Sequence, residues 1–178
     1  TQLEYTFLRT LMDRHKDFWQ ITEDSLDKSM KVYKIDNSLK KELLNLYKKL
    51  SVFPEVKQTL TKLKEKKLKL AILSNGTPAL LNGLVNSNNL NNLFDDIFSI
   101  DEVKVYKPSS KVYELPIKKY QIKKNEVAFL SANTWDASGG GNFGYISIWV
   151  NRNNSIFDNL DHKPSSEIKN LNELIKFL

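Results

Sequence analysis

The chain has 178 residues, of which 40% are hydrophobic and 11% aromatic, enough for a buried core and against a disordered chain. It contains no cysteine, which excludes disulfides and thiolate metal sites and fits a cytoplasmic protein, and no apolar run of the roughly 18 residues that span a membrane. The net charge of +6 does not indicate nucleic-acid binding, because only three of the 27 basic residues are arginine and the lysines are spread along predicted helical surfaces.

Residues 1 to about 50 are predicted to be entirely helical. Apolar residues recur at helical spacing from the start of the chain: Leu3, Phe7, Leu8 and Leu11. No capping residue precedes them, which suggests that an upstream segment is missing. Thr22 is predicted to cap a second helix and Ser38 a third. These helices are assigned to a helical cap subdomain over residues 1–51.

From residue 52 onward, short apolar runs alternate with helical patterns. Strands are predicted at residues 68–73, 97–100, 127–130 and 146–150. Helices are predicted to open at Pro54 and Thr77 and to cover residues 108–120, 136–143 and 171–178. This alternation is typical of a parallel sheet with helical crossovers, so residues 52–178 are assigned to an α/β core.

Polar residues follow three of the predicted strands. The segments are Leu73-Ser74-Asn75-Gly76, Val105-Tyr106-Lys107-Pro108 and Ser131-Ala132-Asn133-Thr134-Trp135-Asp136. Taken singly, each fits an ordinary turn or helix start. Ligands of open α/β sheets bind at the carboxyl ends of the strands, so three such segments at one edge of a sheet indicate a binding or catalytic site.

Together these segments resemble the (S)-2-haloacid dehalogenases of the haloacid dehalogenase superfamily. Residues 2–9 (QLEYTFLR) resemble the helix that opens that family's cap, and residues 71–76 (AILSNG) resemble its second core motif. Lys107 with Tyr113 resembles the third motif, and residues 131–136 (SANTWD) resemble the fourth. The resemblance covers essentially the whole chain and implies a Rossmann-like core with a parallel sheet and an all-helical cap.

The resemblance implies hydrolytic dehalogenation of (S)-2-haloacids to (R)-2-hydroxyacids through an aspartyl ester, with no metal or other cofactor. Lys107 would keep the attacking aspartate ionised, and the other implied catalytic residues would position the carboxylates and the hydrolytic water: Ser131, Asn133, Asp136 and Tyr113. The implied substrate-binding residues are Ser74, Asn75, Leu3, Phe18 and Trp135. For Leu3 and Phe18, simple packing inside the cap is an equally good interpretation.

Two alternatives to a dehalogenase are carried forward. A magnesium-dependent phosphatase of the same superfamily would need an aspartate where Ala132 stands, and an alanine methyl group cannot ligate a cation. Dehalogenation is therefore favoured over phosphate hydrolysis. The other alternative is a non-catalytic, truncated remnant.

The sequence also departs from the family. The first motif, Asp-x-Tyr-Gly-Thr-Leu on the central first strand, carries the nucleophile and is not found among the 178 residues, nor is the halide-binding arginine upstream of the cap. We therefore expect an incomplete core and a chain that is inactive alone. Pro116 inside a helix costs about 3 kcal/mol, and each glycine of Gly139-Gly140-Gly141 costs up to about 1 kcal/mol. With the missing motif, these departures indicate a truncated or decaying homologue, or a fragment of a longer chain.

Three apolar residues and the two histidines complete the predictions. Leu8, Leu11 and Met12 form either the homodimer interface that the resemblance implies or internal packing. His15 and His162 fall in no motif and are interpreted as surface residues.

Overall fold

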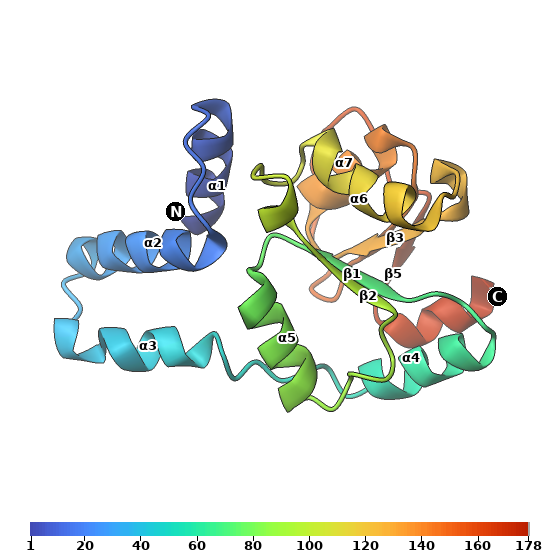
Figure 1. Cartoon of the computed structure of the whole chain (residues 1–178), viewed down its shortest axis with the longest axis horizontal. Coiled ribbons are helices and arrows are strands. Elements are labelled where there is room, and N and C mark those ends of the chain that lie inside the picture. Colours follow the sequence, from blue (N-terminus) through green and yellow to red (C-terminus); the bar gives the residue numbers. More distant parts are fainter. Residues whose placement is uncertain (178) are drawn as a thin grey trace. The chain divides into compact units, whose positions relative to one another are not determined.

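A computed structural model describes residues 1–177 and shows an α/β protein with parallel strands (Figure 1), so the predicted fold class is confirmed. The contacts divide the chain into two compact units. The first unit joins Thr1–Val52 with Ile72–Tyr106, and the second joins Phe53–Ala71 with the residues from Lys107 onward. This grouping differs from the division into a cap of residues 1–51 and a core of residues 52–178, which stays a prediction.

The first unit begins with the helices α1 (Gln2–Leu11), α2 (Phe18–Val32) and α3 (Lys40–Leu46), with the 3-10 turn η1 (Asn37–Leu39) before α3. Thr22 lies inside α2, so its prediction as a cap is wrong. The cap is Asp17, whose extended backbone lets its side chain accept the N–H of Gln20 at 3.0 Å. Thr22 instead donates to the carbonyl of Phe18 at 2.7 Å. Ser38 lies within η1, where Asp36 accepts its N–H at 2.8 Å, so it caps no helix either.

The remaining elements of the first unit are β1 (Ala71–Ser74), α5 (Pro78–Ser87), β2 (Asp96–Ser99) and the 3-10 turn η2 (Ile100–Glu102). The predicted start of α5 is confirmed, because Thr77 accepts the N–H of Leu80 at 3.3 Å. α5 packs on β2, and β2 pairs with β1. β1 begins three residues later than the predicted start at Leu68.

The second unit is built on three parallel strands. They are β3 (Ala128–Ser131), β4 (Ile146–Val150) and β5 (Ser166–Ile168), with β4 in the middle. The helical elements are α4 (Val56–Glu65), α6 (Ser110–Tyr120), η3 (Lys124–Glu126), α7 (Thr134–Phe143) and η4 (Leu171–Phe177). α7 connects β3 to β4 and packs on both. At the carboxyl end of β3, Ser131 pairs in register with Trp149 of β4.

Three features of the sheet and helices differ from the sequence interpretation. The described strands form two sheets, β1 with β2 and β3 with β4 and β5, whereas one sheet was predicted. The last predicted helix is the 3-10 segment η4. α6 continues through the buried Pro116, and α7 continues through Gly139, Gly140 and Gly141. Neither the proline nor the glycines therefore break the helix that contains them.

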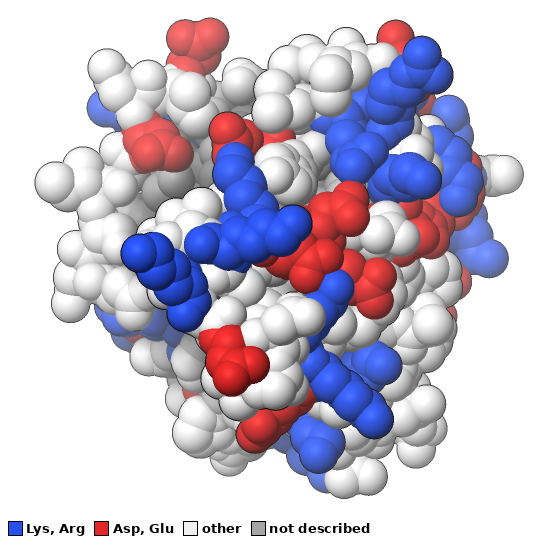
Figure 2. Space-filling model, turned by 90° about the vertical axis from the view of Figure 1, so that its left-hand side faces the viewer, with Lys and Arg blue, Asp and Glu red and all other residues white. Residues whose placement is uncertain are grey.

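None of the described helices is long and apolar enough to cross a lipid bilayer. On the face shown in Figure 2, lysines and arginines lie among acidic side chains and form no uniform basic patch. In the first unit, for example, Lys40 pairs with Asp27 at 2.7 Å. This mixture agrees with the interpretation of the lysines as a solvated surface, and the absence of a nucleic-acid partner stays a prediction.

Candidate active site

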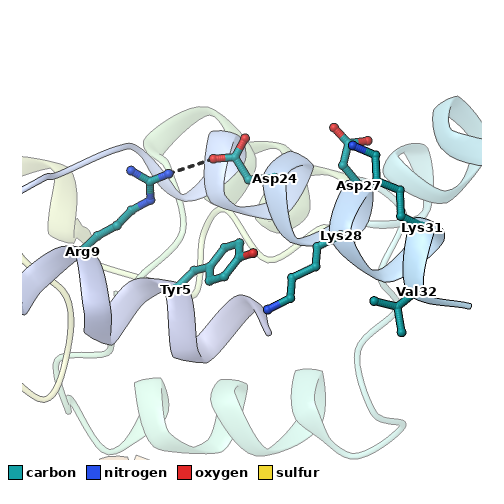
Figure 3. Close-up of a pocket in the computed structure, with 7 residues that line it drawn as sticks. All are labelled: Tyr5, Arg9, Asp24, Asp27, Lys28, Lys31 and Val32. Carbon is teal, nitrogen blue, oxygen red and sulfur yellow. Dashed lines mark hydrogen bonds and ion pairs between the residues drawn. The ribbon is translucent and has the colours of Figure 1, made fainter.

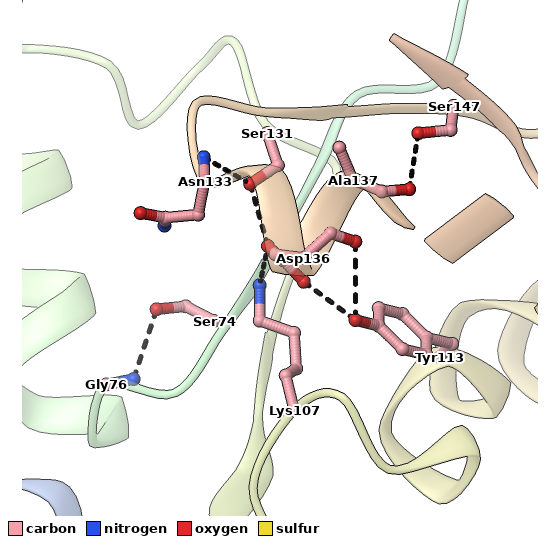
Figure 4. A network of polar contacts seen from close by, with 9 residues as sticks. All are labelled: Ser74, Gly76, Lys107, Tyr113, Ser131, Asn133, Asp136, Ala137 and Ser147. Atoms are coloured by element: carbon pink, nitrogen blue, oxygen red, sulfur yellow. Dashed lines mark hydrogen bonds and ion pairs between the residues drawn. The ribbon is translucent and has the colours of Figure 1, made fainter. Parts of the chain in front are cut away.

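Asp136 is the centre of a buried polar network in the second unit (Figure 4). Its carboxylate oxygen Oδ2 accepts from Lys107 Nζ at 2.7 Å and from Ser131 Oγ at 2.9 Å. Its other oxygen, Oδ1, accepts from Tyr113 Oη at 2.8 Å. Asp136 is only 3% exposed, so these protein donors take the place of water around its carboxylate. Four of the five residues with an implied catalytic role therefore meet at one carboxylate.

The local fold explains why these residues meet. Ser131 ends β3, and Asp136 lies in the first turn of α7, where free backbone N–H groups stabilise a negative charge. Asn133 occupies the position before α7, and its backbone N–H donates to Ser131 Oγ at 3.2 Å. Its side-chain amide points away from Asp136 (Figure 4). Asn133 thus joins the network through its backbone.

Tyr113 is fully buried on α6 among aromatic rings. Its ring lies 5.5 Å from that of Phe129 and 5.8 Å from that of Phe143, and its backbone carbonyl accepts a hydrogen bond from Tyr145 Oη. Burial, and secondly the negative charge of Asp136, raise the pKa of the Tyr113 hydroxyl far above its ordinary value. The hydroxyl therefore stays protonated and acts as a donor to Asp136.

Lys107 and Asp136 form an ion pair with almost no access to solvent. Their side chains are 10% and 4% exposed. Within residues 1–177, no three histidine, aspartate or glutamate side chains gather to form a metal site. Around Asp136, a buried ammonium and two buried hydroxyl groups are positioned to hold a carboxylate.

Two hydrogen bonds from β4 fix α7 and the loop before it. Ser147 Oγ donates to the carbonyl of Ala137 at 2.6 Å (Figure 4), and Trp149 Nε1 donates to the carbonyl of Ala132 at 3.2 Å. The sequence interpretation missed both residues. Their only signal is that they lie on a predicted strand, which says nothing about partners on the helix.

In the first unit, Ser74 is the last residue of β1, and Asn75 begins the turn that follows it. Ser74 Oγ accepts the N–H of Gly76 at 3.1 Å, and Ser99 Oγ donates to the carbonyl of Gly76 at 2.7 Å. The turn is therefore held both by its own serine and by the end of β2. Its role in substrate binding stays a prediction.

The three residues of the predicted apolar wall lie in different surroundings. Leu3 on α1 is 39% exposed, and Phe18 at the start of α2 lies 6.4 Å from the ring of Tyr106. Both belong to the first unit. Trp135 belongs to the second unit, where it lines a hollow of about 620 Å³ together with Tyr113 and Gly139.

Another hollow, of about 550 Å³, lies in the first unit and contains none of the predicted site residues (Figure 3). It is lined by Tyr5, Arg9, Asp24, Asp27, Lys28, Lys31 and Val32 of α1 and α2. Arg9 pairs with Asp24 across it at 3.0 Å. Because opposite charges are already paired on its walls, we do not assign it to a small anionic substrate.

His15 is not the surface residue that the sequence suggested. Its side chain is 21% exposed, its ring stacks on Tyr106 at 5.7 Å, and its Nε2 lies 3.7 Å from Asp101 Oδ1. Burial, and secondly the charge of Lys104, lower the pKa of His15. His162 is half-buried and packs against Gly141.

Comparison with known proteins gives a consistent result. Residues 6–150 match the family of haloacid dehalogenase-like hydrolases. The (S)-2-haloacid dehalogenase of Pseudomonas sp. (strain YL) is 38% identical over 98% of this chain and 76% of its own length. A dehalogenase solved as an intermediate complex superposes with a TM-score of 0.96 at 35% identity, over 99% of this chain and 79% of its own. The L-2-haloacid dehalogenase from Xanthobacter autotrophicus with chloropropionic acid covalently bound gives a TM-score of 0.92 at 29% identity, over 99% and 81%.

Proposed function

This chain belongs to the haloacid dehalogenase-like hydrolases and groups there with the (S)-2-haloacid dehalogenases, and on that premise we propose that it takes part in the hydrolysis of (S)-2-haloacids to (R)-2-hydroxyacids. The observation that carries the proposal is the Asp136 network. A buried lysine beside a buried aspartate, with a tyrosine and a serine as further donors, is suited to hold a second carboxylate in place.

In the proposed reaction, an aspartate carboxylate oxygen attacks C2 of the haloacid. The carbon–halogen bond breaks, the halide leaves with the bonding electrons, and the stereochemistry at C2 is inverted. Water then hydrolyses the resulting ester and releases the hydroxyacid. Lys107 would keep the attacking carboxylate ionised, because a neighbouring cation favours its charged form. Ser131, Asn133, Asp136 and Tyr113 would position the carboxylates and the water.

We further propose that Ser74 and Asn75 bind the substrate carboxylate and halide, with Leu3, Phe18 and Trp135 around the alkyl group. In this scheme residues 1–51 act as the cap, and residues 52–178 act as the core that carries the reacting groups. The rigid turn at Gly76 supports the proposal for Ser74, because a fixed turn presents its polar groups in one geometry.

The nucleophile is the part of this scheme that the 178 residues do not supply, because no aspartate among them stands in an Asp-x-Tyr-Gly-Thr segment. We expect the 178-residue chain alone to release no halide. The test measures chloride release from (S)-2-chloropropionate by the chain alone and by a fusion that adds an N-terminal Asp-x-Tyr-Gly-Thr segment.

Release by the fusion, and none when its motif aspartate is changed to asparagine, supports the proposal. Release by the chain alone would contradict the assigned nucleophile and point to another carboxylate, with Asp136→Asn as the variant to test next. Phosphate release from p-nitrophenyl phosphate with Mg²⁺, in place of chloride release, would support the phosphatase alternative against dehalogenation.

The homodimer also belongs among the proposals. Leu8, Leu11 and Met12 on and after α1 are 43%, 79% and 58% exposed, which supports a contact with another chain. Exposed apolar residues that lie together are typical of a surface that contacts another protein. We propose that they contact a second copy of this chain.

A further inference from the structure

Helix α7 contains three consecutive glycines, and each one faces a different side chain. A methyl group built at Gly139 would lie 2.7 Å from Tyr113 Oη and 2.9 Å from Pro108 Cβ. One at Gly140 would meet the ring of Phe129, and one at Gly141 would meet the ring of His162. Cβ atoms essentially never approach other atoms this closely. The helix therefore occupies its position because these three residues have no side chain.

Gly139 differs from the other two because one of its neighbours, Tyr113, belongs to the Asp136 network and the other, Pro108, lies next to a network residue in the sequence. Tyr113 donates to Oδ1 of Asp136, and Pro108 directly follows Lys107, which donates to Oδ2. A side chain at position 139 would therefore meet one donor of the Asp136 carboxylate directly, Tyr113, and would also press on the residue that follows a second donor, Lys107. Asp136 and Gly139 lie three residues apart on the same helix, so they share one face.

Aromatic rings and a backbone hydrogen bond restrict the movement of Tyr113. Its ring is fully buried, and it lies 5.5 Å from Phe129 and 6.2 Å from Tyr145. The backbone of Tyr113 is held as well, through the hydrogen bond from Tyr145 Oη to its carbonyl. A methyl group at position 139 must therefore lengthen the bond from Tyr113 to Asp136 or push α7 away from α6.

We propose that Gly139 is a positioning residue: its lack of a side chain lets the hydroxyl of Tyr113 and the ammonium of Lys107 hold Asp136 at the same time. Its catalytic consequence rests on the proposed dehalogenation, whereas its effect on the network does not. Gly139 thus has a specific role in the site, whereas the sequence analysis treated it only as a glycine that lowers helix stability.

The test uses Gly139→Ala, Tyr113→Phe and the double variant, made both in the 178-residue chain and in the fusion that carries the nucleophile segment. Gly83→Ala is the matched control, because Gly83 also lies inside a helix but a methyl group there would meet nothing within 4 Å. Urea unfolding and the kcat and KM of chloride release are measured for each variant.

We expect Gly139→Ala to lower kcat about tenfold with little change in KM, because it disturbs groups that hold the Asp136 carboxylate and not those proposed to bind substrate. In the Tyr113→Phe background the same change should lower kcat by no more than about threefold, since the oxygen that the methyl group meets is absent. The urea midpoint should show the same partial rescue, and Gly83→Ala should change neither kcat nor the cooperativity of unfolding.

An equal loss from Gly139→Ala in both backgrounds would overturn the proposal and leave Gly139 with a role in helix packing alone. If neither the fusion nor its variants release chloride, the proposed function fails, but the urea cycle still decides whether Gly139 acts through the Tyr113 hydroxyl. A KM increase as large as the kcat decrease would also contradict the proposed role.

Discussion

The ammonium of Lys107 lies 2.7 Å from Oδ2 of Asp136, and both side chains are buried. A buried ion pair adds little net stability when intact, but removal of one partner leaves the other charge without compensation. Substitution of either residue is therefore expected to lower the stability of the fold as well as to disturb the site.

Asp136→Asn should therefore destabilise the chain by about 3–5 kcal/mol, because it strands the buried ammonium of Lys107. Urea unfolding monitored by circular dichroism measures the change. Lys118→Ala is the control, since Lys118 pairs with Glu114 at 2.9 Å on the surface, where its side chain is 74% exposed, and its loss should not shift the midpoint measurably. Equal effects of the two variants would contradict the burial argument.

Asp17→Ala should destabilise the chain by about 1 kcal/mol, because it removes the side-chain acceptor for the N–H of Gln20 at the start of α2. Asp17→Asn is the matched control and should retain most of the stability, since asparagine is an equally good cap. Thermal unfolding separates the two. A loss in Asp17→Asn as large as in Asp17→Ala would show that the charge, and not the cap, is what matters.

The stability of the first unit should depend on the protonation of His15. Burial and Lys104 lower its folded-state pKa, while Asp101 and Asp17 oppose that shift. The unfolded chain therefore binds the proton more readily, and the free energy of unfolding should fall as the pH falls below about 6.5, the value for a free histidine.

Unfolding free energies at about pH 7.5 and about pH 5 test this dependence on protonation. The carboxylates titrate in both proteins, so the comparison of wild type with His15→Gln isolates the histidine. We expect the wild type to lose more stability over this range. Parallel losses in the two proteins would rule out the contribution of His15.

Leu11→Glu should shift the protein from dimer to monomer, because it places a charge in the proposed contact. Sedimentation equilibrium measures the mass directly. Ile156→Glu is the control, since Ile156 is 93% exposed in the second unit and has no role in the proposed contact. A wild type that sediments as a monomer, or a Leu11→Glu variant that remains dimeric, would contradict the proposed interface.

Much of the fold followed from local patterns in the sequence. The segment Ile146–Val150, apolar except for Ser147, is rich enough in β-branched and aromatic residues to specify β4, and Thr77 followed by proline specifies the start of α5. Ser131 and Asp136 come together because Ser131 ends β3 and Asp136 lies in the first turn of α7. Lys107 lies just before α6 and Tyr113 lies on α6, which packs on α7.

The features that could not be predicted depend on contacts between distant residues. β5 contains a single buried apolar residue, Ile168, and exists because it pairs with β4. The burial of His15 depends on Asp101 and Tyr106, which are far away in the sequence. Asp17 and Thr22 are both good caps, and only the extended backbone at Asp17 decides between them.

All the side chains that donate to Asp136 come from one continuous segment of the gene, between Lys107 and Ser131. Mutations elsewhere, for example in the codons of Leu3 and Phe18, leave the composition of that network unchanged. Under the proposed function, selection for a new haloacid can therefore act on the first helices while purifying selection preserves the reaction chemistry.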